Sequence, residues 1–190
     1  MRRWLMAGTL AALGATAWAH RPTTFDAAEI VTDATFSWTI PGDFVTGSEV
    51  FSFSIDYDAP FATPFEILVP TAQGNGSFRP HYVLVGPGLP APDEAMLEAF
   101  PEDVELGEGD GVFYERNDRE DRLLFWEGVM RRALVTSGTT AIAMEAGTYT
   151  IWIWSPEEET GNFLFGFGVE ENFEDGGFGG VFSNWSDFAY

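Results

Sequence analysis

Two histidines are the first residues that could carry chemistry. His20 follows Ala17-Trp18-Ala19, a typical signal-peptidase site, so cleavage after Ala19 would make it the first residue of the mature chain. An N-terminal histidine offers its amino group and a ring nitrogen to a metal, and both suit copper. His81, the second of the two histidines in the sequence, would complete such a site. The alternative is that His20 merely follows the cleavage site and that His81 lies at a strand edge beside Pro80.

A dense set of acids between Asp93 and Asp121 is the second candidate. This segment holds twelve carboxylates, and carboxylates at flexible spacing are calcium ligands. The pattern predicts a calcium site built from four of these acids, Glu108, Asp110, Asp118 and Asp121, together with the amide oxygen of Asn117. The alternative is a solvated face, because no EF-hand or nonapeptide calcium repeat is present.

Trp152 and Trp154 are the third candidate, because residues two apart on a strand share one face. On an open face, the two rings would stack on sugar rings, as in a carbohydrate-binding module. On a covered face, they would belong to the core instead.

No pattern of nucleophilic catalysis is present. A serine triad needs a histidine beside a positioned serine, and the sequence contains no G-x-S-x-G motif. A carboxylate pair for glycoside hydrolysis cannot be located among thirty acids. We therefore expect no enzymatic activity, with an oxidase-type copper activity left open only if the copper site forms.

The compartment follows from the N-terminal segment and the charge. Residues 1–19 read as a signal peptide, with Arg2-Arg3 ahead of a short apolar run. Its removal leaves seven of the nine cations, all arginines, against 30 acids, a net charge near −23. Such a field repels nucleic acid and anionic membranes. We expect a secreted or periplasmic protein without membrane insertion, whose partner is a glycan, a protein or a cell surface. The sequence has no cysteine, so its fold must be held by core packing.

The elements that must position these residues are strands. Ala146–Glu171 predicts a β-hairpin, because Thr148–Trp154 is β-branched or aromatic and Asn162–Val169 alternates large and small residues. Other strands are predicted where alternating or apolar runs end at glycine or proline: Ala34–Ile40, closed by Pro41-Gly42, then Gly47–Tyr57, Phe65–Val69, Tyr82–Val85, Val112–Glu115, Leu123–Glu127 and Thr139–Glu145.

This pattern predicts an all-β fold, a two-sheet antiparallel β-sandwich of jelly-roll-like topology with about nine strands. Leu89–Gly111 is predicted to be a long acidic surface excursion with at most one helical turn, around Glu94–Phe100. The sandwich domain is expected to span residues 20–171. Residues 172–190, rich in Gly, Phe and Asp, are either a tail or a flap on the sandwich.

Ala146-Gly147-Thr148-Tyr149-Thr150-Ile151 with Gly161-Asn162-Phe163-Leu164 resembles the closing hairpin of bacterial pre-peptidase C-terminal domains, which are small jelly-roll sandwiches. The wider pattern resembles a group of uncharacterised secreted proteins of bacteria and archaea. Its matching pieces, over about half of the mature chain, are Ala19-His20-Arg21-Pro22, Pro60-Phe61, Ile67-Leu68-Val69-Pro70 and Val85-Gly86-Pro87-Gly88-Leu89-Pro90. The resemblance implies a secreted sandwich module and no catalytic residues.

The sequence thus favours a secreted or periplasmic, non-catalytic β-sandwich module for binding or surface structure. Two alternatives stay open. One is a periplasmic copper-binding protein that uses His20 with His81, and the other is a calcium-stabilised carbohydrate-binding accessory module.

Overall fold

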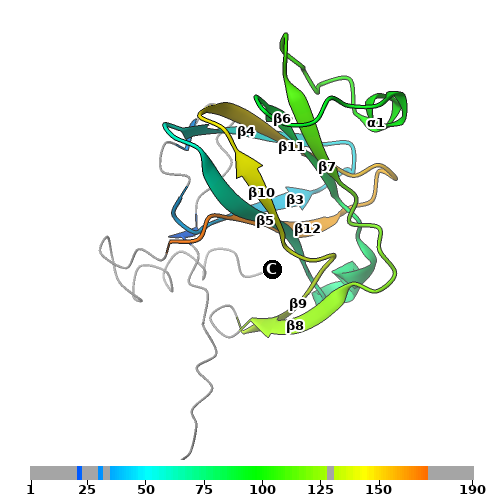
Figure 1. Cartoon of the computed structure of the whole chain (residues 1–190). Coiled ribbons are helices and arrows are strands. Elements are labelled where there is room, and N and C mark those ends of the chain that lie inside the picture. The colour runs from blue at the N-terminus through cyan, green and yellow to red at the C-terminus, as the bar shows by residue number, and fades with distance from the viewer. Residues whose placement is uncertain (1–20, 23–29, 32–34, 128–130, 171–190) are drawn as a thin grey trace, which may run out of the picture.

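The computed structural model describes residues 21–22, 30–31, 35–127 and 131–170, which form two packed sheets (Figure 1). The signal peptide predicted for residues 1–19, His20 and the segment 172–190 lie outside the described residues. The first half of the chain contains β1 (Arg21–Pro22), β2 (Ile30–Val31), β3 (Trp38–Phe44), β4 (Val50–Tyr57), β5 (Phe61–Pro70), the 3-10 helix η1 (Ala72–Ser77) and β6 (His81–Gly86). The second half contains α1 (Glu94–Ala99), β7 (Gly111–Glu115), β8 (Leu123–Glu127), β9 (Arg132–Thr136), β10 (Thr140–Met144), β11 (Gly147–Trp154) and β12 (Gly161–Phe167).

The strand order is that of a jelly roll. Sheet A contains the run β3-β12-β5, with β10 on the other edge of β5, and sheet B contains the run β4-β11-β6-β7. Two four-stranded sheets in this order are the two interlocked Greek keys of a jelly roll. Three additions extend it: β1 and β2 pair in parallel with β3 and β4, and the β8–β9 hairpin extends sheet A at the end of β5. The predicted fold class is confirmed, with twelve described strands where about nine were predicted.

The predicted hairpin over Ala146–Glu171 is wrong, because its two strands lie in different sheets. β11 pairs with β4 and β6, whereas β12 pairs with β3 and β5. Both edges of each strand are therefore occupied, and residues 155–160 carry the chain from sheet B to sheet A as an arch. The central position predicted for both strands is nevertheless correct.

The core lies between the sheets and is rich in aromatic residues. Phe53, Ile55 and Tyr57 of β4 face it, as the alternation in this strand predicts, and Phe163, Phe165 and Phe167 of β12 face them from sheet A. The Phe53 and Phe165 rings meet edge to face, with centroids 5.7 Å apart. Burial of each such side chain contributes roughly 2 to 3 kcal/mol to the stability of the fold. The many aromatic residues of the core together hold the sandwich without a disulfide.

The excursion that begins at Leu89 is not only a surface loop, because it covers the outer face of sheet B. Its short helix α1 is capped by Asp93, whose carboxylate accepts a hydrogen bond from the Met96 N–H at 2.8 Å. Behind α1 lies a second apolar cluster that joins the excursion to the sheet. Its members are Val83, Val85, Val112 and Trp154, with Val50, Met96, Phe100, Val104, Tyr114 and Trp152 packed against them.

Several strand boundaries differ from those predicted: β5, for example, begins at Phe61 and runs through Pro64, where a start at Phe65 was predicted. β3 continues through Pro41-Gly42 to Phe44, where an end was predicted. Among the described residues, β1 pairs only with Trp38 and Thr39, so Pro41 occupies an edge position where a missing N–H is tolerated. β9 was not predicted at all, because Arg131-Arg132 and the short apolar run after it gave no clear alternation. None of the helices in the described part of the chain is long and apolar enough to cross a bilayer.

Candidate functional site

A cleft of about 560 Å³ opens at one end of sheet B, between the end of the strands and the end of α1. Three strand ends supply its floor: His81 opens β6, Tyr114 is near the end of β7, and Trp154 ends β11. The rim comes from loops and the helix end. Its residues are Gly47, Ser48, Glu49, Val50, Glu98, Ala99, Phe100, Pro101, Arg116, Ser155, Pro156 and Glu158.

Strand register brings the floor residues together. His81 lies opposite Trp154 in the β6–β11 ladder, and β7 flanks β6 on its other edge. The ring centroids of His81 and Trp154 are 5.9 Å apart, and those of His81 and Tyr114 are 5.7 Å apart. A hydrogen bond of 2.8 Å joins His81 Nδ1 to the Tyr114 hydroxyl. The imidazole is thus fixed in orientation by the neighbouring strand.

His81 is a neutral ring at physiological pH. Its side chain is 7% exposed, and this burial lowers the pKa of His81 to about 4, with the Arg116 guanidinium adding to the shift and the Asp118 carboxylate opposing it. Burial also raises the pKa of Tyr114, against the opposing effect of Arg116. The pair is therefore an uncharged imidazole and an uncharged phenol joined by a hydrogen bond.

The aromatic rings of the floor form a stack. Tyr114 lies nearly parallel to Trp154, with centroids 5.6 Å apart and planes inclined by 13°. Phe100 meets both rings edge-on, and the Arg116 guanidinium carbon lies 5.5 Å from the centre of the Tyr114 ring. Tyr114 is thus the accessible edge of the apolar cluster, and Arg116 lies beside it.

Two loops shape the rim and touch each other at Gly47. Glu49 Oε1 accepts hydrogen bonds from the backbone N–H groups of Val45 and Thr46, at 3.0 and 2.8 Å, which closes the β3–β4 loop. A side chain at Gly47 would collide with the carbonyl oxygen of Glu158 in the arch. Since Gly47 has a φ of +85°, glycine is required there for conformation as well as for space. The β3–β4 loop is thus closed by the Glu49 side chain and packs closely against the arch.

The rim is predominantly acidic. Glu49, Glu98 and Glu158 contribute carboxylates, and Arg116 is the guanidinium among the lining residues. In a chain with a net charge of −21, this balance favours neutral or cationic ligands over anions.

The structure unites two residues that the sequence singled out for different reasons. His81 was a candidate for copper and Trp154 for sugar stacking, and they form the floor of one cleft. Trp154 is 4% exposed, so Tyr114, Phe100 and the rim cover most of it. Trp152 is half-buried on the same face and packs against the second apolar cluster. Neither indole presents an open stacking face.

The copper prediction pairs His81 with His20, which lies outside the described residues. The next residue, Arg21, pairs with Trp38 at the start of β3. His81 shares its cleft with the loop that follows Phe44, the last residue of β3. The seven residues of β3 span on the order of 20 Å, so the register places Arg21 and His81 at opposite ends of the sandwich. A brace formed by both histidines of one chain would require β1 to leave β3.

The structure does not bring the predicted calcium ligands together. Glu108 and Asp110 precede β7 whereas Asp118 and Asp121 follow it, so the five residues of the strand separate the two pairs. Three of the predicted ligands have other partners. Asp110 accepts from the Gly107 N–H, Asp121 pairs with Arg119 at 3.0 Å, and the Asn117 Oδ1 accepts from the Ser137 hydroxyl. Over the described residues, no group of three or more His, Cys, Asp or Glu side chains is placed to hold a metal.

Sequence reasoning missed Tyr114, Arg116, Phe100 and the rim glutamates. The sequence does indicate that two floor residues lie at strand ends. His81 directly follows a proline, and Trp154 is the last residue before Ser155-Pro156. Which strand ends meet depends on register across three strands, which one sequence does not specify.

The sheets and the cleft define a jelly-roll β-sandwich with a hollow at one end. No protein-family model and no curated protein sequence matches the chain. Among solved structures, it is similar to the pre-peptidase C-terminal domain of a collagenase from Bacillus anthracis. That match has 7% identity and a TM-score of 0.38, over 78% of this chain and 95% of that one. This is the class of domain that the closing strands resemble in sequence, and a likeness this distant says nothing about ligand or activity.

Proposed function

We propose that this chain is a non-catalytic β-sandwich binding module, secreted or periplasmic, whose ligand lies in the cleft over His81. One observation carries the proposal: the ends of three strands and two loops that touch at Gly47 build a hollow of about 560 Å³ from aromatic, cationic and carboxylate side chains. A preformed concave site with an apolar floor and a few polar groups is the usual form of a ligand pocket.

The state of His81 supports binding rather than catalysis. A general base must accept a proton near neutral pH, and a histidine whose pKa is lowered to about 4 accepts one poorly. Its Nδ1 is bonded to a phenol, not to a serine hydroxyl. In this account, the imidazole positions Tyr114 and presents its ring edge to a ligand.

A carbohydrate is the ligand class that this lining suits best. Sugars combine apolar faces, which pack on aromatic side chains, with hydroxyls, which hydrogen-bond to carboxylates and guanidinium groups. The acidic rim favours a neutral or amine-bearing sugar over a uronic acid. The platform is the Tyr114 edge with Arg116, in place of the two tryptophans that the sequence suggested.

Titration calorimetry with three hexasaccharides that differ in charge tests this proposal: oligoglucosamine, cellohexaose and oligogalacturonate. We expect binding of the cationic or the neutral oligomer, with Kd of about 10 µM to 1 mM, and no binding of the anionic one. Arg116→Ala should weaken the interaction at least tenfold. Arg119→Ala removes an exposed arginine outside the cleft and should leave the interaction unchanged. Absence of heat for all three oligomers, or equal losses in both variants, would reject a carbohydrate site in the cleft.

A further inference from the structure

The strand β8 has an unusual surface for a soluble protein. Four consecutive large apolar residues of β8 are exposed: Leu123 by 63%, Leu124 by 68%, Phe125 by 38% and Trp126 by 66%. Since side chains alternate along a strand, both faces of β8 are apolar. Contiguous exposed apolar surface of this kind marks an interaction site.

β8 is also the last strand in the order of sheet A, next to β9. Edge strands are normally protected by charges, proline or a bulge, because their outer N–H and C=O groups can pair with another strand. Two other edge strands lack such an apolar surface. The outward residues of β10 are the small Ala141 and Ala143. In the described part of the chain, none of the exposed large apolar residues lies in β7. β8 is thus an edge strand whose exposed apolar side chains favour pairing with a strand of another molecule.

The charge around β8 suits a second copy of the same chain. Two molecules with a net charge of −21 repel each other over most of their surfaces. Residues 119–132 differ, because they carry four arginines against three acids: Arg119, Arg122, Arg131 and Arg132 against Glu120, Asp121 and Glu127. The charges of this segment therefore nearly balance, so two copies repel each other less at β8 than their net charge implies.

We propose that β8 is a homodimer interface, in which the β8 strands of two copies pair antiparallel across a two-fold axis. In this arrangement the four apolar side chains of one copy lie opposite those of the other, and the outer backbone groups of both strands become hydrogen-bonded. A single five-residue strand covers less than the roughly 800 Å² per partner of a stable interface. We therefore expect a weak dimer, visible at about 10 to 500 µM.

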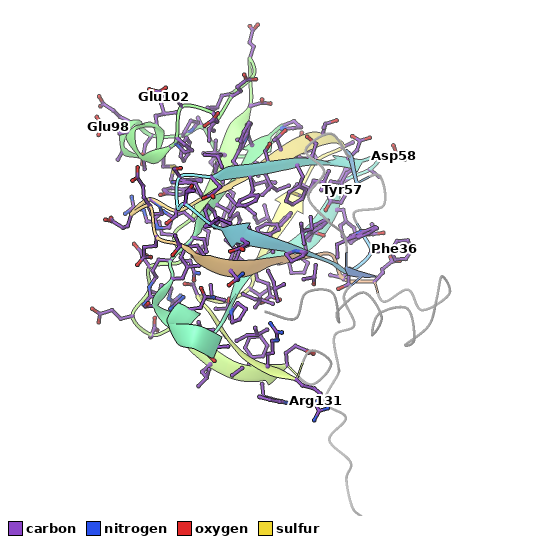
Figure 2. The ribbon with its side chains drawn as sticks, turned by 180° about the vertical axis from the view of Figure 1, so that it is seen from behind. Phe36, Tyr57, Asp58, Glu98, Glu102 and Arg131 are labelled. Atoms are coloured by element: carbon purple, nitrogen blue, oxygen red, sulfur yellow. The ribbon has the colours of Figure 1, made fainter. Side chains whose placement is uncertain are left out.

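The dimer would leave the His81 cleft free. Glu98, which lines the cleft, and Arg131, just before β9, lie on opposite sides of the molecule (Figure 2). Two open clefts in one dimer make the protein bivalent, which raises the avidity for a repetitive ligand without any new contact.

Sedimentation velocity of the purified protein, from 5 to 500 µM and at 50 and 500 mM NaCl, tests the proposal. We expect a monomer–dimer equilibrium that tightens at high salt, because salt screens the repulsion between two acidic copies. Leu124→Glu should raise the dimer Kd at least tenfold. Leu97→Glu makes the same change at an exposed leucine on α1 and should not alter it.

Three results would overturn the dimer. A monomer under all conditions would do so, as would equal behaviour of the two variants. Association that weakens with salt would do so as well, because it would show that ion pairs and not the apolar strand hold the two copies together. Circular dichroism of both variants establishes that each remains folded, which the exposure of both leucines leads us to expect.

Discussion

His81 shows how the position of one residue decides its chemistry. An exposed histidine titrates near pH 6.5, but burial at the start of β6 lowers the pKa of His81 to about 4. The unfolded chain therefore takes up this proton first as the pH falls from about 6.5 to about 4, so the folded state loses stability over that window. The loss amounts to at most about 3 kcal/mol.

Comparison with His81→Gln isolates this effect from the titration of the many carboxylates. We expect the free energy of unfolding of the wild type, relative to that of the variant, to fall by about 2 to 3 kcal/mol between pH 7 and pH 4. Urea denaturation at a series of pH values measures it. A difference that stays constant with pH would mean that His81 is not held neutral in the folded state.

At the residue scale, the sequence identified candidate side chains but not their neighbours. His81 and Trp154 were both singled out, yet for separate sites, because their contact arises from the β6–β11 register. Tyr114 had no distinguishing pattern, since an aromatic residue is ordinary in a strand, and Arg116 directly follows the end of β7. The β6–β7 pairing brings Tyr114 to the cleft, and Arg116 follows because its guanidinium lies over the Tyr114 ring.

Among the elements, the two loops of the rim depend on one glycine. Gly47→Ala places a methyl group against the Glu158 carbonyl and also strains a residue with a φ of +85°. Gly109→Ala is the matched control, since Gly109 has a φ of +89° and open space around it. We expect a cost of about 1 kcal/mol for the control and at least about 3 kcal/mol for Gly47→Ala.

Urea denaturation of the two glycine variants gives these costs directly. Equal losses of stability would show that conformation alone matters at Gly47 and that the arch does not press on the β3–β4 loop. A larger loss at Gly47, together with weaker ligand binding, would show that the rim loops are held in place by each other.

Strands were well predicted where alternation is strong, as in β4 and β12. The pairing of β11 with β12 was not, because the polar residues 155–160 fit a hairpin turn and an arch equally well. What decides between them is that β4, β6, β3 and β5 already occupy both edges of each strand. These pairings depend on contacts between residues far apart in the sequence. The packing of the excursion over Trp154 depends on such contacts too.

For the whole molecule, the dominant electrostatic feature is the net charge of −21. Like charges oppose the compact state, and salt screens them over a distance of about 10 Å at 0.1 M. Raising NaCl from 50 to 500 mM should therefore stabilise the fold by about 1 kcal/mol, which raises Tm by about 2 to 4 °C for a chain of this size.

Calorimetry at 5 µM, below the concentrations expected for the dimer, measures this effect on the monomer. A Tm that falls with salt would indicate that attractive ion pairs outweigh repulsion in the fold. The described contacts argue against that, since the pair Arg119–Asp121 is exposed and local, and such pairs contribute little.

The cleft over His81 is where we propose that this sandwich binds its ligand. The most direct test is two-dimensional ¹⁵N NMR of the protein titrated with oligoglucosamine hexamer and with cellohexaose. We predict that signals of Ser48, Tyr114, Arg116 and Ser155 shift with a common saturation curve while those of Leu123–Trp126 do not. Shifts confined to β8, or no saturable shifts with either oligomer, would contradict the claim.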